Sequence, residues 1–153
     1  MTELPDTWSS SWAWSLPLIV FTVVGHSFGL LLITGQATAT LTRMARGFRL
    51  TFGVTMSAVV LLVILLHGLE GEAWAGAYLW LGALPDLKSA TLYSLEAMTT
   101  YGHTNVELAA HWRLMGALEA LNGMILFGLT TAFLFDVVQS ALASRLTDDN
   151  RRL

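Results

Sequence analysis

The side chains best placed to interact with a dissolved ion gather in residues 99–105. They are Thr99, Thr100, Tyr101, Gly102, His103, Thr104 and Asn105. This polar segment follows a short helix-like stretch, residues 86–98, which begins after Pro85 with Asp86. Proline suits the first turn of a helix, and an aspartate complements its positive end. The C-terminal end of such a helix carries a partial negative charge, so we expect the polar segment to attract a cation.

Three apolar stretches position this region, at residues 14–35, 52–69 and 114–142. A helix needs roughly 20 mostly apolar residues to cross the hydrocarbon core of a bilayer. All three stretches are of that order, whereas residues 86–98 are too short to span. The order of span, short helix, polar segment and span is that of a re-entrant loop. Irregular backbone at membrane depth is tolerated only inside protein or beside water.

Composition excludes most other classes of protein. Of 153 residues, 54% are hydrophobic and only 12% are charged, and the mean hydropathy is +0.59. A soluble domain carries about 25% charged residues. The absence of cysteine excludes disulfides and thiolate metal sites,. A net charge of −3 without a basic block argues against nucleic-acid binding,.

No sequence pattern indicates an enzyme. The chain has no phosphate-binding glycine-rich loop, no His-Glu-x-x-His motif and no Ser/His/Asp arrangement on a plausible scaffold,. We therefore expect no catalytic residues, no cofactor and no small-molecule substrate. The predicted class is a small all-α integral membrane protein whose environment is the lipid bilayer.

Arginine placement predicts the orientation. One cluster lies between the first two spans and another follows the third: Arg43, Arg46 and Arg49, then Arg145, Arg151 and Arg152. Cytoplasmic segments collect Lys and Arg. We therefore expect three crossings of a bacterial-type inner (plasma) membrane, with the N-terminus outside and the C-terminus in the cytoplasm.

Several short motifs resemble one known family. Residues 93–102 read Tyr-Ser-Leu-Glu-Ala-Met-Thr-Thr-Tyr-Gly, and residues 112–114 read Trp-Arg-Leu. Residues 117–123 and 127–135 are similar to an inner helix of that family, reading Ala-Leu-Glu-Ala-Leu-Asn-Gly and Phe-Gly-Leu-Thr-Thr-Ala-Phe-Leu-Phe. The region resembles the pore domain of bacterial potassium-channel-type proteins, the tetrameric two-helix pore-loop family.

The resemblance implies a homotetrameric cation channel with K⁺ or Na⁺ in its filter. The implied pore domain covers residues 51–142. It consists of an outer helix at 52–69 extended to about 83, a pore helix at 86–98, a filter at 99–105 and an inner helix at 114–142. Residues 1–50 would add an N-terminal transmembrane helix and a cytoplasmic arginine-containing loop. Residues 143–153 would form a short cytoplasmic tail.

The filter departs from the family pattern, which is Thr-Val-Gly-Tyr-Gly and replaces the hydration shell of K⁺ with carbonyl oxygens. Aligned without gaps, residues 100–104 occupy those five positions. His103 then replaces the tyrosine and Thr104 the second glycine, and a β-branched residue resists positive φ. Glu96 would support the filter from behind by a hydrogen bond to Asn105. We expect a cation pathway with poor K⁺ selectivity.

Polar and apolar residues form one stripe on the third span. Their spacing alternates between four and three residues, which keeps them on one helix face: Asn122, Leu126, Leu129, Phe133 and Asp136. The stripe either lines a pore, with Leu129 and Phe133 as a gate, or packs against other helices. Gly123 and Gly128 are either hinges or close-packing positions.

Two further patterns leave alternatives open. His103, Glu107 and His111 recur every four residues and would share a face on a helix, so they are weak candidates for a zinc site. His26 in the first span is interpreted as a contact between helices. The alternatives to a channel are a non-conducting or regulatory protein that retains the pore fold, and a small metal-binding membrane protein.

Overall fold

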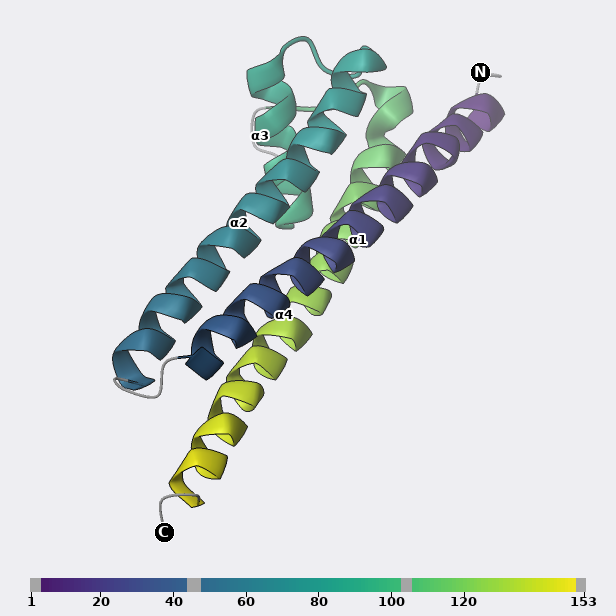
Figure 1. Ribbon diagram of the computed structural model, residues 1–153. Helices are drawn as coiled ribbons and strands as arrows, with labels where there is room; N and C mark the ends of the chain where they lie inside the picture. Colours follow the sequence, from purple (N-terminus) through teal and green to yellow (C-terminus); the bar gives the residue numbers. More distant parts are fainter. Residues whose placement is uncertain (1–3, 44–47, 103–105, 151–153) are drawn as a thin grey trace. The chain divides into compact units, whose positions relative to one another are not determined.

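The structure is a computed structural model that describes residues 4–43, 48–102 and 106–150. The described residues form four α-helices and one short 3-10 helix, and no strand (Figure 1). The elements, in chain order, are α1 (Leu4–Arg43), α2 (Phe48–Trp80), α3 (Leu87–Met98), η1 (Ala110–Trp112) and α4 (Arg113–Asn150).

Three of these helices are long and apolar enough to cross a membrane. The candidate spans are Trp8–Ala37, Leu50–Trp80 and Ala110–Ala143. They confirm the expected all-α class with three long apolar helices, which makes the chain a multi-pass membrane protein. α2 continues without a break from its apolar centre to Trp80. Aliphatic side chains such as Leu61 and Leu65 are more than half exposed on it, as suits a lipid-facing surface,.

The chain divides into two compact units. The first unit, here called the loop unit, comprises Met1–His26 and His67–Phe127. The second, here called the helix unit, comprises Ser27–Leu66 and Gly128–Leu153. The loop unit therefore holds α3, η1 and the polar segment, whereas the described residues of the helix unit belong to the long helices.

The helix unit has an aliphatic core. Its buried side chains are Leu30, Ile33, Ala37, Val59 and Val63, and partly buried Leu66, Leu129, Phe133 and Leu134 pack against them. A Cβ on Gly29 would lie 2.7 Å from a methyl carbon of Leu66. In lipid, where burial of apolar surface gives little drive, such close approach supplies van der Waals contact between helices.

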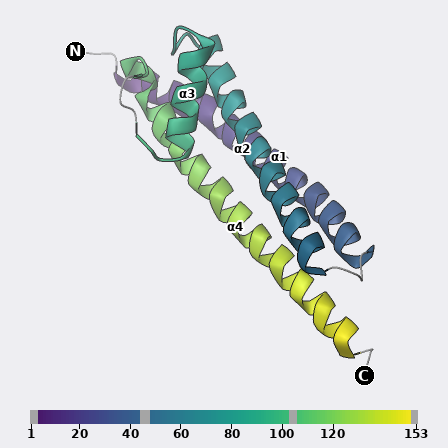
Figure 2. The same cartoon turned by 90° about the vertical axis from the view of Figure 1, so that its left-hand side faces the viewer.

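The loop unit has an aromatic core around α3. Tyr78 of α2 and Tyr93 of α3 meet edge to face, with ring centroids 5.4 Å apart. Trp74, Tyr78 and Met115 have no exposed surface at all. α3 lies beside the C-terminal part of α2 in both views (Figure 1, Figure 2). The short helix is thus held by contacts with its neighbours, because twelve residues alone make a marginal helix,.

Candidate functional site

The start of α3 is fixed by its N-cap. Asp86 has extended backbone, with φ −152° and ψ 160°, and its Oδ1 accepts a hydrogen bond from the Ser89 backbone N–H at 3.0 Å. The Ser89 hydroxyl donates to Oδ2 at 2.8 Å. These bonds favour the charged carboxylate, so they lower the pKa of Asp86, the backbone bond most of all. An ionised aspartate therefore caps the positive end of α3.

The end of α3 is closed by two main-chain hydrogen bonds. The Thr100 N–H donates to the Ala97 carbonyl at 3.0 Å, and the Tyr101 N–H donates to the Glu96 carbonyl at 3.0 Å. This is the Schellman pattern, which requires a left-handed residue one position beyond the C-cap. That residue is Thr100, with φ 55°. A β-branched residue in this conformation is strained, and such strain is often found at functional sites.

The end of α2 has the same hydrogen-bond pattern with a different residue. Gly82 donates to Leu79 at 3.1 Å and Ala83 donates to Tyr78 at 2.8 Å. The left-handed residue is Gly82, with φ 64°, and glycine adopts that conformation without strain,. Two helices of one unit thus end alike, and only the end that leads into the polar segment carries a threonine.

The end of α3 packs closely against a glycine of α4. A Cβ added to Gly123 would collide with the main chain of Met98, the carbonyl oxygen first of all. Gly71 of α2 faces the same end of α3, where its Cβ would touch Ser94 and Met98 at 3.5 and 3.6 Å. Gly123 lies ten residues beyond Arg113, which is about 15 Å along α4,. The last turn of α3 therefore packs well inside the length of both neighbouring helices.

Gly128, the second proposed hinge, differs from Gly123 in how closely other residues pack against it. Apart from the adjacent residues and the backbone of α4 itself, no atom of the described residues lies within 4 Å of a Cβ built on Gly128. Gly123 is therefore placed as a close-packing position, whereas nothing in the described part of the chain requires a glycine at 128.

A buried carboxylate joins three helices behind α3. Glu119 of α4 has no exposed surface. Its Oε2 accepts a hydrogen bond from the Tyr78 hydroxyl at 2.6 Å, and its Oε1 accepts a short one from the Ser94 hydroxyl. Ser94 also lies 2.8 Å from the Gly71 carbonyl. Buried polar groups that are fully connected in this way define a single packing arrangement.

Glu96 occupies a different place from Glu119. It lines a cavity of about 530 Å³ together with Tyr93, Thr100, Gly102, Glu107 and Arg113. The carboxylate buried behind α3 thus belongs to Glu119, and Glu96 faces the cavity beside the polar segment. Asn105, the expected partner of Glu96, lies outside the described residues.

The first four residues of the polar segment are exposed on the single chain. Thr99 donates its hydroxyl to the Leu95 carbonyl at 2.6 Å, and the Tyr101 side chain is 77% exposed. Gly102 has φ 92°, a conformation that favours glycine,. His103 and Thr104 lie outside the described residues, so their geometry stays a prediction.

The stripe of residues on α4 is divided between packing and surface. Asn122 and Leu126 have no exposed surface, and the Asn122 amide donates to the Thr22 hydroxyl of α1 at 2.8 Å. Leu129 and Phe133 pack against the aliphatic core of the helix unit, whereas Asp136 is exposed. The contacts of Asn122 are those that the packing interpretation predicts.

Of the weak zinc candidates, Glu107 and His111 lie within the described residues, and each contacts a different neighbour. Glu107 forms an exposed ion pair with Arg113, with Oε2 and Nη2 2.9 Å apart. The ring of His111 lies in η1, 5.3 Å from that of Trp112. His103, the third candidate, lies outside the described residues.

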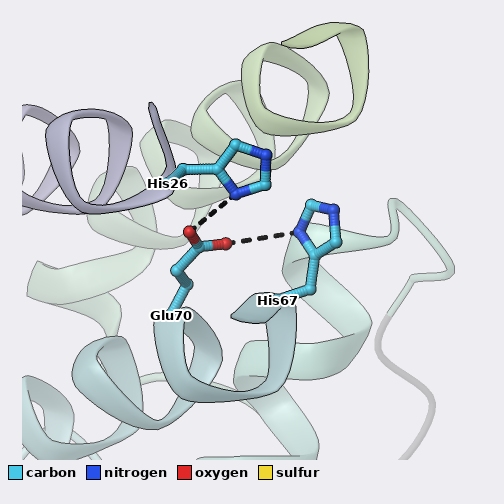
Figure 3. A group of neighbouring side chains, drawn as sticks. All are labelled: His26, His67 and Glu70. Atoms are coloured by element: carbon cyan, nitrogen blue, oxygen red, sulfur yellow. Dashed lines mark hydrogen bonds and ion pairs between the residues drawn. The ribbon is translucent and has the colours of Figure 1, made fainter. Parts of the chain in front are cut away.

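A cluster of three ionisable side chains, here called the His-Glu cluster, comprises His26, His67 and Glu70. His26 of α1 and His67 of α2 direct their Nδ1 atoms at the two carboxylate oxygens of Glu70 (Figure 3). The His26–Glu70 distance is 2.8 Å and the His67–Glu70 distance is 3.3 Å. His26 therefore makes the expected contact between helices.

Sequence reasoning did not identify His67 and Glu70 as part of a site. They are three residues apart on a helix, which places them on one face. That spacing was the available signal, but the partner on α1 is 44 residues from Glu70 in the chain.

Comparison of this chain with family models, with curated proteins and with solved structures finds no match.

Proposed function

We propose that four copies of this chain form a cation channel of the potassium-channel type. In this proposal α3 is the pore helix, residues 99–105 are the filter, and α2 and α4 are the outer and inner helices. The observation that carries the proposal is the contact between Met98 and Gly123.

That contact supports a re-entrant path. Gly123 lies well inside the candidate span Ala110–Ala143, and Gly71 lies well inside Leu50–Trp80. The last turn of α3 packs against both glycines. In this proposal the polar segment therefore begins at a depth where lipid cannot satisfy its backbone. A water-filled path lined by protein would satisfy it.

The exposure of the segment supports assembly around an axis. Thr99, Thr100, Tyr101 and Gly102 are exposed on the single chain. One chain supplies one loop, which cannot surround an ion. Four loops related by a rotation axis would form a closed ring. Closed symmetry of this kind is common among homo-oligomers.

Cation preference follows from the direction of α3 and from nearby carboxylates. The C-terminal end of α3 presents its partial negative charge to the segment. Glu96 and Glu107 line the adjoining cavity, where Arg113 is the basic residue. Such a field raises the local concentration of cations.

Weak discrimination between K⁺ and Na⁺ follows from the sequence of the filter. At the filter, Thr104 stands where the family has a glycine. Fewer ordered rings of inward-pointing carbonyls would then be left to coordinate an ion, and selectivity depends on such rings.

Ion flux tests the function directly. Purified protein in liposomes should pass K⁺ and Na⁺ with similar ease, measured as a reversal potential under a K⁺/Na⁺ gradient. The double variant His103→Tyr, Thr104→Gly should shift the ratio toward K⁺, whereas the control His111→Tyr should not. A tetramer without flux would identify a non-conducting protein and overturn the proposal, as would a monomer.

The proposal includes a plasma-membrane location with the N-terminus outside and the C-terminus in the cytoplasm. The chain has no cysteine, so single introduced cysteines report position without background. Asp6→Cys should react with an impermeant thiol reagent from outside. Ala45→Cys and Thr147→Cys should react only from inside, and labelling of position 45 from outside would reverse the orientation.

A further inference from the structure

We propose that the His-Glu cluster, His26, His67 and Glu70, binds a divalent transition-metal ion such as Zn²⁺. This site goes beyond the proposed channel: it uses none of the residues of the polar segment.

The chemistry of the three side chains suits such an ion. Two imidazoles and one carboxylate form a common protein ligand set for zinc, one that leaves a fourth position for water. The same set binds other first-row metals, with Cu²⁺ favoured by intrinsic affinity. Hard cations such as Mg²⁺ prefer all-oxygen sites, so they should bind weakly.

The spacing of the donor atoms fits one ion. Zinc bonds to nitrogen and oxygen are about 2.0–2.1 Å long, so ligand atoms around a tetrahedral ion lie about 3.3 Å apart. The two nitrogen–oxygen distances of the cluster are 2.8 and 3.3 Å. All three ligand atoms lie within 4.8 Å of one another. Side-chain movements of about 1 Å would bring the more distant ligand atoms to the spacing of a tetrahedral ion.

The burial of the His-Glu cluster favours binding of a cation. His26 has no exposed surface, Glu70 is 6% exposed and His67 is 15% exposed. All three lie in helices that meet the criteria for membrane spans. An ionisable group at such a position is costly unless it is paired or coordinates a metal. A divalent ion would compensate the carboxylate charge and use both imidazole nitrogens.

Neighbouring rings hold the ligands in place. Phe127 of α4 stacks on His67, with ring centroids 4.7 Å apart and planes 22° apart. His26 and His67 lie 4.9 Å apart, centroid to centroid. The orientation of the ligands is therefore set by α1, α2 and α4 together, as a preorganised site requires.

The four histidines of the chain provide a matched experiment, because two lie in the cluster and two lie outside it. Untagged protein in detergent is titrated with Zn²⁺ against a chromophoric chelator, with Mg²⁺ as the hard-cation control. We expect one Zn²⁺ per chain for the wild type and for the control double variant that carries both His103→Ala and His111→Ala. For the double variant that carries both His26→Ala and His67→Ala, we expect the Zn²⁺ affinity to be at least about 100-fold weaker. Loss of even a supporting contact lowers the metal affinity of a site 10–100-fold.

Conservative variants keep the test informative if the double alanine variant does not fold. Glu70→Gln and His67→Gln retain side-chain size, and each should weaken Zn²⁺ binding at least about 10-fold while the helical content by circular dichroism stays unchanged. X-ray absorption of the zinc-loaded protein should show nitrogen and oxygen ligands with imidazole scattering.

Three outcomes would overturn the assignment: no binding by wild-type protein, unchanged binding by folded Glu70→Gln, or loss of binding in His103→Ala, His111→Ala alone. The last would transfer the metal to the outer candidates. Zinc binding does not depend on flux, so the failure of the channel proposal and the failure of this one are separate results.

Discussion

The loop unit and the helix unit are built from the same long helices but use different interactions. Among the described residues, buried polar or ionisable side chains of the helix unit are Thr55 and Thr130 alone. The loop unit buries Ser11, Ser15, Thr22, His26, Glu70, Ser94, Glu119 and Asn122. Aliphatic contacts in one unit thus contrast with directional hydrogen bonds in the other.

The difference shows where a defined geometry is required. Aliphatic side chains can slide past one another at small cost, because lipid is as apolar as they are. A hydrogen bond from Tyr78 to Glu119 tolerates little displacement, and breaking it leaves a buried donor unpaired,. The loop unit therefore holds a fixed arrangement around α3, and the helix unit supplies length and lipid contact.

The largest expected effect comes from removing the carboxylate that joins three helices. Glu119→Ala would leave the Tyr78 hydroxyl without its hydrogen-bond acceptor. It would also remove one of the two acceptors of the Ser94 hydroxyl. We expect a loss of roughly 2–5 kcal/mol, since each unsatisfied buried group costs about 1–3 kcal/mol. Thermal unfolding in detergent measures it. Glu107→Ala, in an exposed ion pair, should change stability by less than about 1 kcal/mol, and equal effects would contradict the comparison.

Two glycines of α4, one in each unit, provide the next test. Gly123→Ala should destabilise by roughly 1–3 kcal/mol, because its Cβ meets the main chain of Met98 and overpacking costs that much,. Gly128→Ala should leave stability unchanged or raise it by up to about 1 kcal/mol, the helix propensity gained. The melting temperatures of both variants measure this difference. A destabilised Gly128→Ala variant would contradict the expected difference between the two glycines.

A reciprocal exchange at two helix ends tests the strain within the loop unit. Thr100→Gly should stabilise by about 1 kcal/mol, since it removes a side chain from a left-handed residue. Gly82→Thr should destabilise by a similar amount for the same reason. Both variants are measured by thermal unfolding in one detergent. A loss of stability in Thr100→Gly would show that the threonine side chain makes contacts that outweigh its strain.

The smallest effect is expected at the exposed start of α3. The pKa of Asp86 is lowered by its bonds to Ser89, so its stabilising effect is present above its ordinary pKa near 3.8,. It is lost as the pH falls through the lower pKa of the folded state. Asp86→Asn keeps a cap that does not titrate. The melting temperature of the wild type should therefore fall more than that of Asp86→Asn below pH 4, and parallel curves would argue against an ionised cap.

Hydropathy and local spacing were enough to predict the long helices. The three apolar stretches lie within α1, α2 and α4, and residues 87–98 form a short helix with Asp86 as its cap. These features depend on residues close together in the chain. α2 extends to Trp80 past the polar pair Glu70 and Glu72, close to the end of the expected extension at about residue 83.

Partners across helices could not be read from the sequence. Periodicity assigned Asn122 and Leu126 to one face of α4, but it did not say that the Asn122 amide meets Thr22, 100 residues earlier in the chain. The interpretation of Glu96 as a support of the polar segment stays a prediction, whereas the hydrogen bonds of Glu119 to Tyr78 and Ser94 were not predicted. A helical face identifies which side chains share a surface, and only packing selects what they touch.

The hydrogen bonds of Glu119 also constrain how the protein is made. Tyr78 and Ser94 precede Glu119 by 41 and 25 residues, so both hydroxyls enter the translocation machinery before their acceptor has been synthesised. Ser94 has an earlier acceptor in the Gly71 carbonyl, whereas Tyr78 must wait for α4. During biogenesis the short helix can therefore dock against α2 first, and the aromatic core closes only when α4 is released beside it.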